Sequence, residues 1–163
     1  MVTDQYNMER RRVFRVLISV SDKENIVDLA RALHSLEIEI VSTGGTYQTI
    51  SKEGIDVMSV EKITNFPEIM GGRVKTLHPL IFGGILARDS DSKDAEKHSI
   101  DFFDMVVCNL YPFREAVSKG VDSESLVEKI DIGGPSLLRA SAKNHARVAV
   151  VSDPADYNWI IEE

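Results

Sequence analysis

Residues 13–20 read VFRVLISV, and this stretch sets the fold class of the chain. It is short, apolar and rich in β-branched side chains, which indicates a buried β-strand. Ser21 and Asp22 then offer N-caps for a helix whose apolar side chains recur at helical spacing: Ile26, Leu29, Leu33 and Leu36. The chain therefore begins its fold with a buried strand followed by an amphipathic helix.

The same alternation continues to the end of the chain. Further strands are predicted at residues 38–41, 57–60, 104–110 and 147–151, and helices at 47–52, 123–129, 136–143 and from 153 onward. Residues 89–97 form a charged, solvated insertion. Apolar strands that alternate with helices favour an α/β fold of three layers, with a mainly parallel twisted sheet flanked by helices. Ligands of such sheets bind outside the carboxyl ends of the strands.

Composition narrows the classes of protein that remain. The 163 residues, 43% of them hydrophobic, fit one domain over residues 13–163 that follows a flexible tail at 1–12. A net charge of −7 argues against non-specific binding of nucleic acid. No apolar run approaches the roughly 20 residues that span a bilayer, so no membrane partner is expected. Cys108, the single cysteine, is expected to be a buried reduced thiol, which fits a cytoplasmic protein.

The charges along the chain are unevenly spread. The chain carries 26 acids, yet none lies between residues 69 and 88, a run that contains Arg73 and Lys75. A cationic loop on an acidic protein captures an anion through its local field. A solvated basic loop is the alternative. We predict an anion site that includes Arg73, Val74, Lys75 and Thr76.

Two more loops at strand ends carry groups that suit a phosphate. Ser21, Asp22 and Lys23 follow the first strand, where a hydroxyl and an ammonium at a helix N-terminus would face an oxyanion. Ordinary capping also explains them. The second strand is followed by Thr43, Gly44, Gly45 and Thr46, in a run from 41 to 51 without any charge. The glycines would let backbone N–H groups approach a phosphate, although a plain turn has the same composition.

A second acid-free run covers residues 132–152 and contains Arg139 and Lys143 on one helical face. A surface basic face is the alternative to a functional cluster. Asp131 lies just before this helix, whose N-terminus favours an ionised carboxylate. We therefore take Asp131 and Lys143 as a candidate base and acid pair.

The predicted strand at 104–110 ends in an amide, a phenol and a ring, within Asn109-Leu110-Tyr111-Pro112-Phe113. These groups suit a heterocyclic base, and a turn that ends the strand is the alternative. No spacing of His, Cys, Asp and Glu matches a metal site, and no Walker-type or GxGxxG loop is present.

Eight motifs together resemble the IMP cyclohydrolase domain of the bifunctional purine biosynthesis protein family. They occur in the family's order at residues 19–23 (SVSDK), 42–46 (STGGT), 66–68 (FPE), 72–79 (GRVKTLHP), 84–88 (GILAR), 109–113 (NLYPF), 130–134 (IDIGG) and 142–145 (AKNH). The resemblance runs from about residue 14 to 157, and it implies a methylglyoxal-synthase-like α/β fold.

The resemblance also implies a reaction. The carboxamide nitrogen of 5-formamidoimidazole-4-carboxamide ribonucleotide attacks the formyl carbon, and water leaves to give IMP, the last step of de novo purine biosynthesis. The family uses no cofactor or metal and acts on a purine nucleotide as a homodimer. Because the sequence ends at Glu163, we expect no formyltransferase domain.

Site residues follow from the motifs. The 5′-phosphate and its surroundings would contact Ser21, Asp22, Lys23, Thr43, Gly44, Gly45 and Thr46, and the ribose and carboxamide would contact Arg73, Val74, Lys75 and Thr76. The base would lie against Asn109, Leu110, Asp131 and Ile132. Lys143 would give or take the proton, Asp131 would deprotonate or orient the carboxamide, and Lys75 and Tyr111 would assist at the developing charge.

Two other functions share the fold. A methylglyoxal-synthase-type lyase would use an aspartate base on a triose phosphate, which leaves the KTLHP and AKNH segments unexplained. A sensing module like the allosteric domain of carbamoyl-phosphate synthetases would bind a phosphate or nucleotide without turnover. It gives no reason for Asp131 beside Lys143.

Overall fold

The computed structural model describes residues 11–163, which contain a five-stranded parallel sheet. Its strand order is β3-β2-β1-β4-β5, with bounds β1 Arg15–Val20, β2 Glu39–Ser42, β3 Met58–Ser59, β4 Met105–Asn109 and β5 Ala149–Val151. The first strand of the chain is thus the centre of the sheet. The chain adds β2 and β3 on one side of β1 and later adds β4 and β5 on the other.

Alternate side chains of β1 and β4 point to opposite faces of the sheet, as strand geometry requires. Val16, Ile18 and Val107 belong to one buried cluster, while Leu17 and Val106 belong to the other. Both faces are apolar because both are covered, which is the normal state of a parallel sheet.

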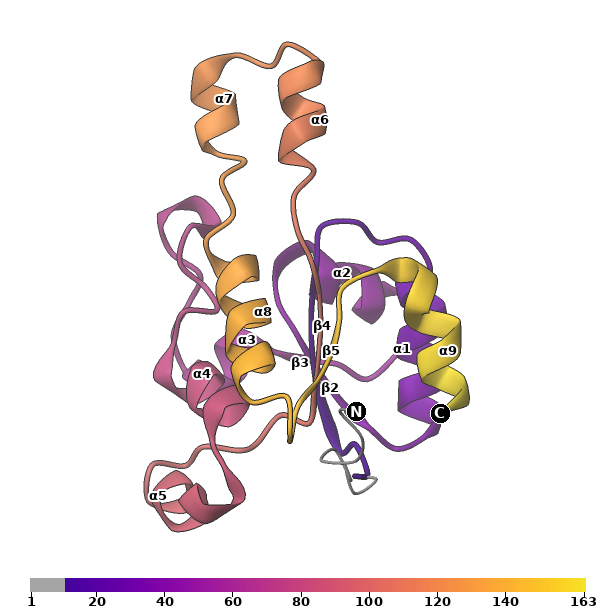
Figure 1. The fold of residues 1–163 in the computed structure, drawn as a ribbon, viewed down its shortest axis with the longest axis vertical. Helices are drawn as coiled ribbons and strands as arrows, with labels where there is room; N and C mark the ends of the chain where they lie inside the picture. Colours follow the sequence, from indigo (N-terminus) through magenta and orange to yellow (C-terminus); the bar gives the residue numbers. More distant parts are fainter. Residues whose placement is uncertain (1–10) are drawn as a thin grey trace, which may run out of the picture.

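Within the described residues, six helices form the two outer layers, three on each face of the sheet (Figure 1). The first cluster is covered by α1 Ile26–Ser35, α2 Gly44–Lys52 and α9 Tyr157–Glu162. The second is covered by α3 Val60–Thr64, α4 Pro79–Leu86 and α8 Gly133–Lys143. The predicted three-layer α/β fold is confirmed.

Several helix bounds differ from the sequence prediction. α2 and α8 each begin three residues earlier, at Gly44 and Gly133, because glycines at a helix start cost little once the helix packs on the sheet. Between β3 and α4 the chain forms α3 and a short 3-10 helix, η1 Met70–Gly72, neither of which the sequence predicted. The charged insertion at 89–97 forms η2 Asp89–Asp91 and the exposed helix α5 Ser92–Lys97.

The predicted N-caps of the first helix are wrong. α1 begins at Ile26, and its N-cap is Asn25 in the left-handed conformation. Asp22 instead accepts a hydrogen bond from the Glu24 backbone N–H in a local turn, at 2.9 Å. Ser21 and Lys23 therefore lie on a loop and not at the helix N-terminus.

An arm projects beyond the sheet between β4 and α8 (Figure 1). It consists of α6 Phe113–Ser118, which the sequence did not predict, and α7 Ser123–Val127. Neither helix has a buried residue, although the arm carries large apolar side chains. The other end of the chain continues from β5 through η3 Pro154–Asp156 into α9.

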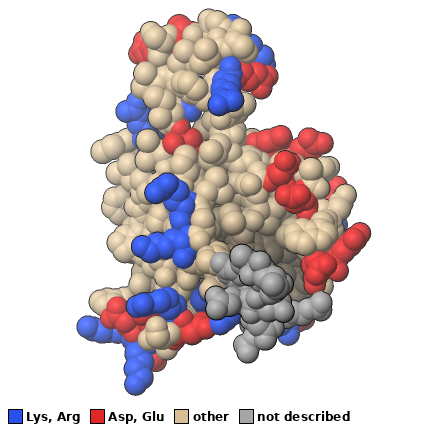
Figure 2. Space-filling model, viewed as in Figure 1, with Lys and Arg blue, Asp and Glu red and all other residues tan. Residues whose placement is uncertain are grey.

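The charges segregate by face. Figure 2 shows basic side chains over α8 and acidic side chains gathered over α1 and α9. The predicted flexible tail lies mainly outside the described residues. Of its two described residues, Arg11 pairs with Asp89, and the Arg12 guanidinium lies 5.1 Å from the centre of the Phe14 ring. Within residues 11–163, no helix is long and apolar enough to cross a membrane.

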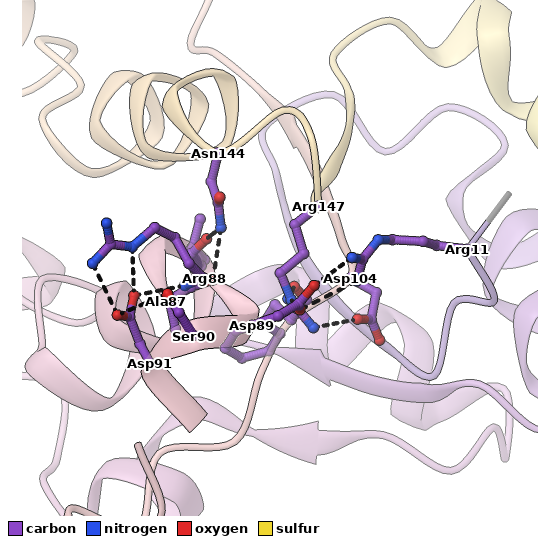
Figure 3. A network of polar contacts seen from close by, with 11 residues as sticks. Arg11, Ala87, Arg88, Asp89, Ser90, Asp91, Asp104, Asn144 and Arg147 are labelled. Carbon is purple, nitrogen blue, oxygen red and sulfur yellow. Dashed lines mark hydrogen bonds and ion pairs between the residues drawn. The ribbon is translucent and has the colours of Figure 1, made fainter. Parts of the chain in front are cut away.

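A polar network ties the strands together at the end of the sheet opposite the arm (Figure 3). The Asp104 carboxylate accepts hydrogen bonds from the backbone N–H groups of Phe14 and Arg15, at 2.9 and 3.1 Å, and from the Arg147 guanidinium, at 2.9 Å. Arg147 also donates to the Phe103 carbonyl, and its guanidinium lies over the ring of Phe102. Asp104 thus joins the entry of β1 to the segment that leads into β5.

We expect Asp104→Ala to lower the free energy of unfolding by about 3 kcal/mol, because it leaves a mostly buried guanidinium without its main partner. Urea unfolding followed by circular dichroism measures the change. The matched control is Asp94→Ala on the exposed helix α5, which should change stability by no more than about 0.5 kcal/mol. Equal effects of the two substitutions would contradict a structural role for the network.

Candidate functional site

A cavity of about 590 Å³ opens at the carboxyl ends of the central strands. This volume lies within the range usual for small-molecule sites. Its walls come from the ends of β1, β2 and β4, from the basic segment after α3, and from the foot of the arm where it meets α8. Parallel strands bring all these loops to one edge of the sheet, where ligands of such folds bind.

The N-terminus of α2 forms one wall. Gly44 and Gly45 open the helix, so their backbone N–H groups have no partner within it. Thr43, the N-cap residue, is 3% exposed, and its hydroxyl lacks a hydrogen-bond partner among the described residues. Buried hydroxyls nearly always have a hydrogen-bond partner. Because this one lines the cavity and has none, a ligand that binds there could supply the partner. Together these donors suit an anion at a helix N-terminus.

Lysines approach this wall from two loops. A methyl group built on Gly45 would lie 3.8 Å from the Lys23 ammonium, and one built on Gly44 would lie 3.5 Å from the Lys75 ammonium. Lys23 also donates to the Ser21 carbonyl at 3.3 Å. Two ammonium groups therefore lie beside the first turn of α2, where each would complement a bound anion.

The loop after β1 is held in place by Asn109 at the end of β4. The Asn109 side-chain oxygen accepts from the backbone N–H groups of Ser21 and Asp22, at 2.7 and 2.9 Å, and its amide donates to the Asp22 carbonyl at 2.9 Å. Thr46 fixes the same loop from α2 through two hydrogen bonds with the backbone of Val20. Asn109 lines the cavity, but most of its hydrogen-bonding capacity serves the loop.

Asp131 lies at the entry of α8. Its carboxylate accepts from the Gly134 backbone N–H at 2.8 Å. A methyl group on Gly134 would meet the Asp131 carboxylate at 2.4 Å and Leu110 at 2.7 Å, so only glycine leaves room for this arrangement. The carboxylate is fixed at a helix N-terminus, where negative charge is favoured.

In the folded chain, carboxylates lie beside the basic segment, although none occurs within residues 69–88. Arg73 forms a two-point contact with Glu128 at the foot of the arm, and Lys75 lies 3.8 Å from Glu68. The Arg73 guanidinium holds the pKa of the Glu128 carboxyl below its usual value. The sequence run without acids therefore forms two ion pairs with carboxylates that line the cavity.

Cys108 is fully buried beneath the site and unbonded to sulfur, as the sequence predicted. Burial, with a smaller contribution from the Asp131 carboxylate, raises the pKa of its thiol to about 12. The thiol is therefore protonated at neutral pH and acts as a small apolar side chain.

Most of the predicted site residues line this one cavity. They are Ser21, Lys23, Thr43, Gly45, Thr46, Arg73, Lys75, Thr76, Asn109, Tyr111, Asp131 and Ile132. Four others lie beside it without lining it: Asp22, Gly44, Val74 and Leu110. Of these, Gly44 borders the cavity through Lys75, while the Asp22 carboxylate is used in the turn described above.

The structure corrects the predicted pairing of Lys143 with Asp131. Lys143 is the last residue of α8, whereas Asp131 lies before the first, and Lys143 does not line the cavity. Eleven helical residues extend for about 16.5 Å at 1.5 Å per residue. One copy of the chain therefore does not bring Lys143 and Asp131 together as a base and acid pair. The spacing in the sequence predicted that a helix begins after Asp131 and contains Lys143. It did not show that the two residues lie at opposite ends of this helix.

Sequence reasoning missed several residues that line the cavity. They include Glu68, Gly72, Glu128, Gly133 and Gly134. The FPE, GRVKTLHP and IDIGG motifs contain four of these residues, so a signal was present for Glu68, Gly72, Gly133 and Gly134. Nothing in the sequence indicates Glu128, because its proximity depends on how the arm folds back beside the basic segment.

The fold and the cavity define an α/β domain of the MGS-like class. A family model described as MGS-like domain matches residues 25–136, and the chain belongs to this family. It is 55% identical, over 93% of its length, to the Bifunctional purine biosynthesis protein PurH of Brucella anthropi and to that of Brucella ovis. The chain spans 29% of the length of these relatives.

Solved structures show the same architecture. The crystal structure of ForH matches 91% of this chain and 76% of its own, with a TM-score of 0.80 and 36% identity. The methylglyoxal synthase from Elizabethkingia anophelis NUHP1 matches with a TM-score of 0.53 and 15% identity, over 93% of this chain and 78% of its own. The second match reflects the fold alone.

The unpaired hydroxyl of Thr43 gives a stability prediction. We expect Thr43→Val to raise the free energy of unfolding of the ligand-free chain by about 1 kcal/mol, because it removes a buried polar group that has no partner. The matched control Thr46→Val removes a paired hydroxyl and should lower stability by about 1 kcal/mol or more. Urea unfolding checks both, and a loss of stability in Thr43→Val would contradict the assignment.

Proposed function

We propose that this chain is an IMP cyclohydrolase, which closes the second ring of the purine in 5-formamidoimidazole-4-carboxamide ribonucleotide. The proposal rests on the set of chemical groups that border one cavity. A helix N-terminus with an unpaired buried hydroxyl, the ammonium groups of Lys23 and Lys75, and the Asp131 carboxylate all border the same space. The similarity of the chain to PurH supports a role in purine biosynthesis.

The substrate would bind with its 5′-phosphate at the first turn of α2. The backbone N–H groups there, the Thr43 hydroxyl and the Lys23 ammonium supply donors for a dianion. The base would then extend toward Tyr111, Asp131 and Ile132 on the far wall. The cavity volume supports a ligand of nucleotide size.

The chemistry requires little more than position and proton transfer. The carboxamide nitrogen forms a bond to the formyl carbon and loses one proton to Asp131, whose carboxylate lines the cavity. The formyl oxygen becomes an oxyanion next to Lys75 and takes up one proton to become a hydroxyl. The formamido nitrogen then loses its proton as the C=N bond forms, and the hydroxyl leaves with a second proton as water, so the two protons lost from nitrogen balance the two gained by oxygen. Fixed donors at a developing oxyanion commonly contribute a rate factor of about 10²–10³. Alignment of the two reacting groups adds to this.

The first test is turnover. We expect the chain to convert the formamido-carboxamide nucleotide to IMP, followed by ultraviolet absorbance, and to make no methylglyoxal from dihydroxyacetone phosphate. Lys75→Met and Asp131→Asn should each lower kcat by about 10²-fold or more, while the exposed substitution Lys93→Met should leave it unchanged. Binding of IMP without any turnover would instead favour a sensing module.

We also propose that the active form is a homodimer. The arm and its foot support this, since they leave large apolar side chains partly exposed: Tyr111, Phe113, Val117, Val127 and Ile130. Exposed apolar surface of this kind marks an interaction site. A catalytic role for Lys143 then requires that a second copy deliver it, because its own cavity is at the other end of α8.

Mixing two inactive variants tests this arrangement. If Lys143 acts in the cavity of the second copy, Asp131→Asn and Lys143→Ala chains mixed in equal amounts should recover about a quarter of the wild-type activity, since half the dimers would then hold one intact site. Analytical ultracentrifugation should show dimers that Val117→Glu disrupts and Leu36→Glu, at the C-cap of α1, does not. Wild-type activity of Lys143→Ala alone would remove Lys143 from catalysis.

A further inference from the structure

Glu68 and Lys75 lie opposite each other across a short turn at the cavity wall. The turn is closed by an antiparallel bridge in which Ile69 and Val74 exchange backbone hydrogen bonds of 3.1 and 3.4 Å. Glu68 and Lys75 are the next residues outward on each side, so they form the neighbouring cross-strand pair. The Lys75 ammonium lies 3.8 Å from the Glu68 carboxylate. Backbone geometry therefore brings the two charges together.

Two glycines leave the space that this ion pair occupies. A methyl group on Gly72 would meet the Glu68 carboxylate at 2.7 Å and the Lys75 ammonium at 3.7 Å. One on Gly44, at the start of α2, would lie 3.5 Å from the ammonium and 3.9 Å from the carboxylate. Both glycines have positive φ, +91° and +54°, which other residues rarely adopt. The ion pair is thus bordered by two glycines, Gly44 and Gly72, that lie far apart in the sequence.

A carboxylate at this place would weaken a site whose only task is to bind an anion. Glu68 lines the cavity, and its negative charge opposes a phosphate beside Lys75. The same carboxylate is useful if Lys75 must act at one fixed point on the reacting groups. A lysine side chain has four rotatable bonds, and a partner that limits them holds the ammonium in position.

We infer that Glu68 is a positioning residue that fixes the Lys75 ammonium toward the reacting formyl oxygen. This inference rests on the cyclohydrolase function proposed above. Glu68 acts through Lys75 and not on the substrate. Its removal should therefore impair the chemical step more than the binding of the nucleotide, because a misplacement of about 1 Å can cost about 10²-fold in rate.

The steady-state kinetics of Glu68→Gln test the inference. We expect kcat to fall by roughly ten- to a hundredfold while KM changes by less than about threefold. Glu68→Asp, which keeps the charge on a shorter side chain, should recover part of kcat. In a Lys75→Met background, Glu68→Gln should have no further effect, since the two residues act as one unit. The matched control is Glu96→Gln on α5, which makes the same change of charge far from the cavity.

Two results would overturn the inference. One is an unchanged kcat with tighter binding of IMP by calorimetry, which would make Glu68 only a competitor of the ligand anion. The other is an equal, additive loss in the Lys75→Met background.

A measurement without turnover separates this inference from the proposed function. The side-chain ammonium resonance of Lys75, assigned by its loss in Lys75→Met, should shift or broaden in Glu68→Gln and stay in place in Glu96→Gln. A wild-type chain that makes no IMP would overturn the cyclohydrolase function, while this resonance would still decide whether Glu68 holds Lys75. An unmoved resonance would overturn the positioning role.

Discussion

The structure depends on the hydrogen-bond ladders that β1 shares with two parallel neighbours. Residues 15–18 pair with residues 39–42 of β2, and residues 16–20 pair with residues 105–109 of β4. Since all three strands run in one direction, the loops that follow them meet at one edge. Ser21, Thr43 and Asn109 reach the same cavity for this reason, although they are far apart in the chain. At the opposite edge, Asp104 and Arg147 join the entries of β1 and β5.

Charge at the cavity is arranged in pairs, with some donors left for a ligand. Glu128 and Glu68 accompany Arg73 and Lys75, so the basic segment is largely neutralised in the ligand-free chain. The donors left over belong to the backbone at the start of α2, to the hydroxyl of Thr43 and to the ammonium of Lys23. Donors gathered at a helix N-terminus suit the phosphate that is proposed to bind there.

Local pattern predicted much of this protein correctly. β-Branched runs located all five strands of the described sheet. For β1 and β4 the reason is that a strand buried on both faces must be largely apolar. Helical spacing located α1 and α8, but not their first residues: the preference of Ser21 and Asp22 for caps was overridden at Asn25, and glycines began α2 and α8. The helix α6 was missed because its six residues make fewer than two turns, which is too short for helical periodicity to show.

By itself, the sequence determined the α/β class, the family, and most of the residues that line the cavity, since these follow from short motifs at strand ends. Only the tertiary structure decided which charges meet. It brought Glu68 and Glu128 to a segment that has no acid in the sequence, and it set Lys143 at the far end of α8 from Asp131. The physical reason is that charges act through space: two residues outside an acid-free run can neutralise it, and a helix of eleven residues separates its ends by more than an ion pair can span.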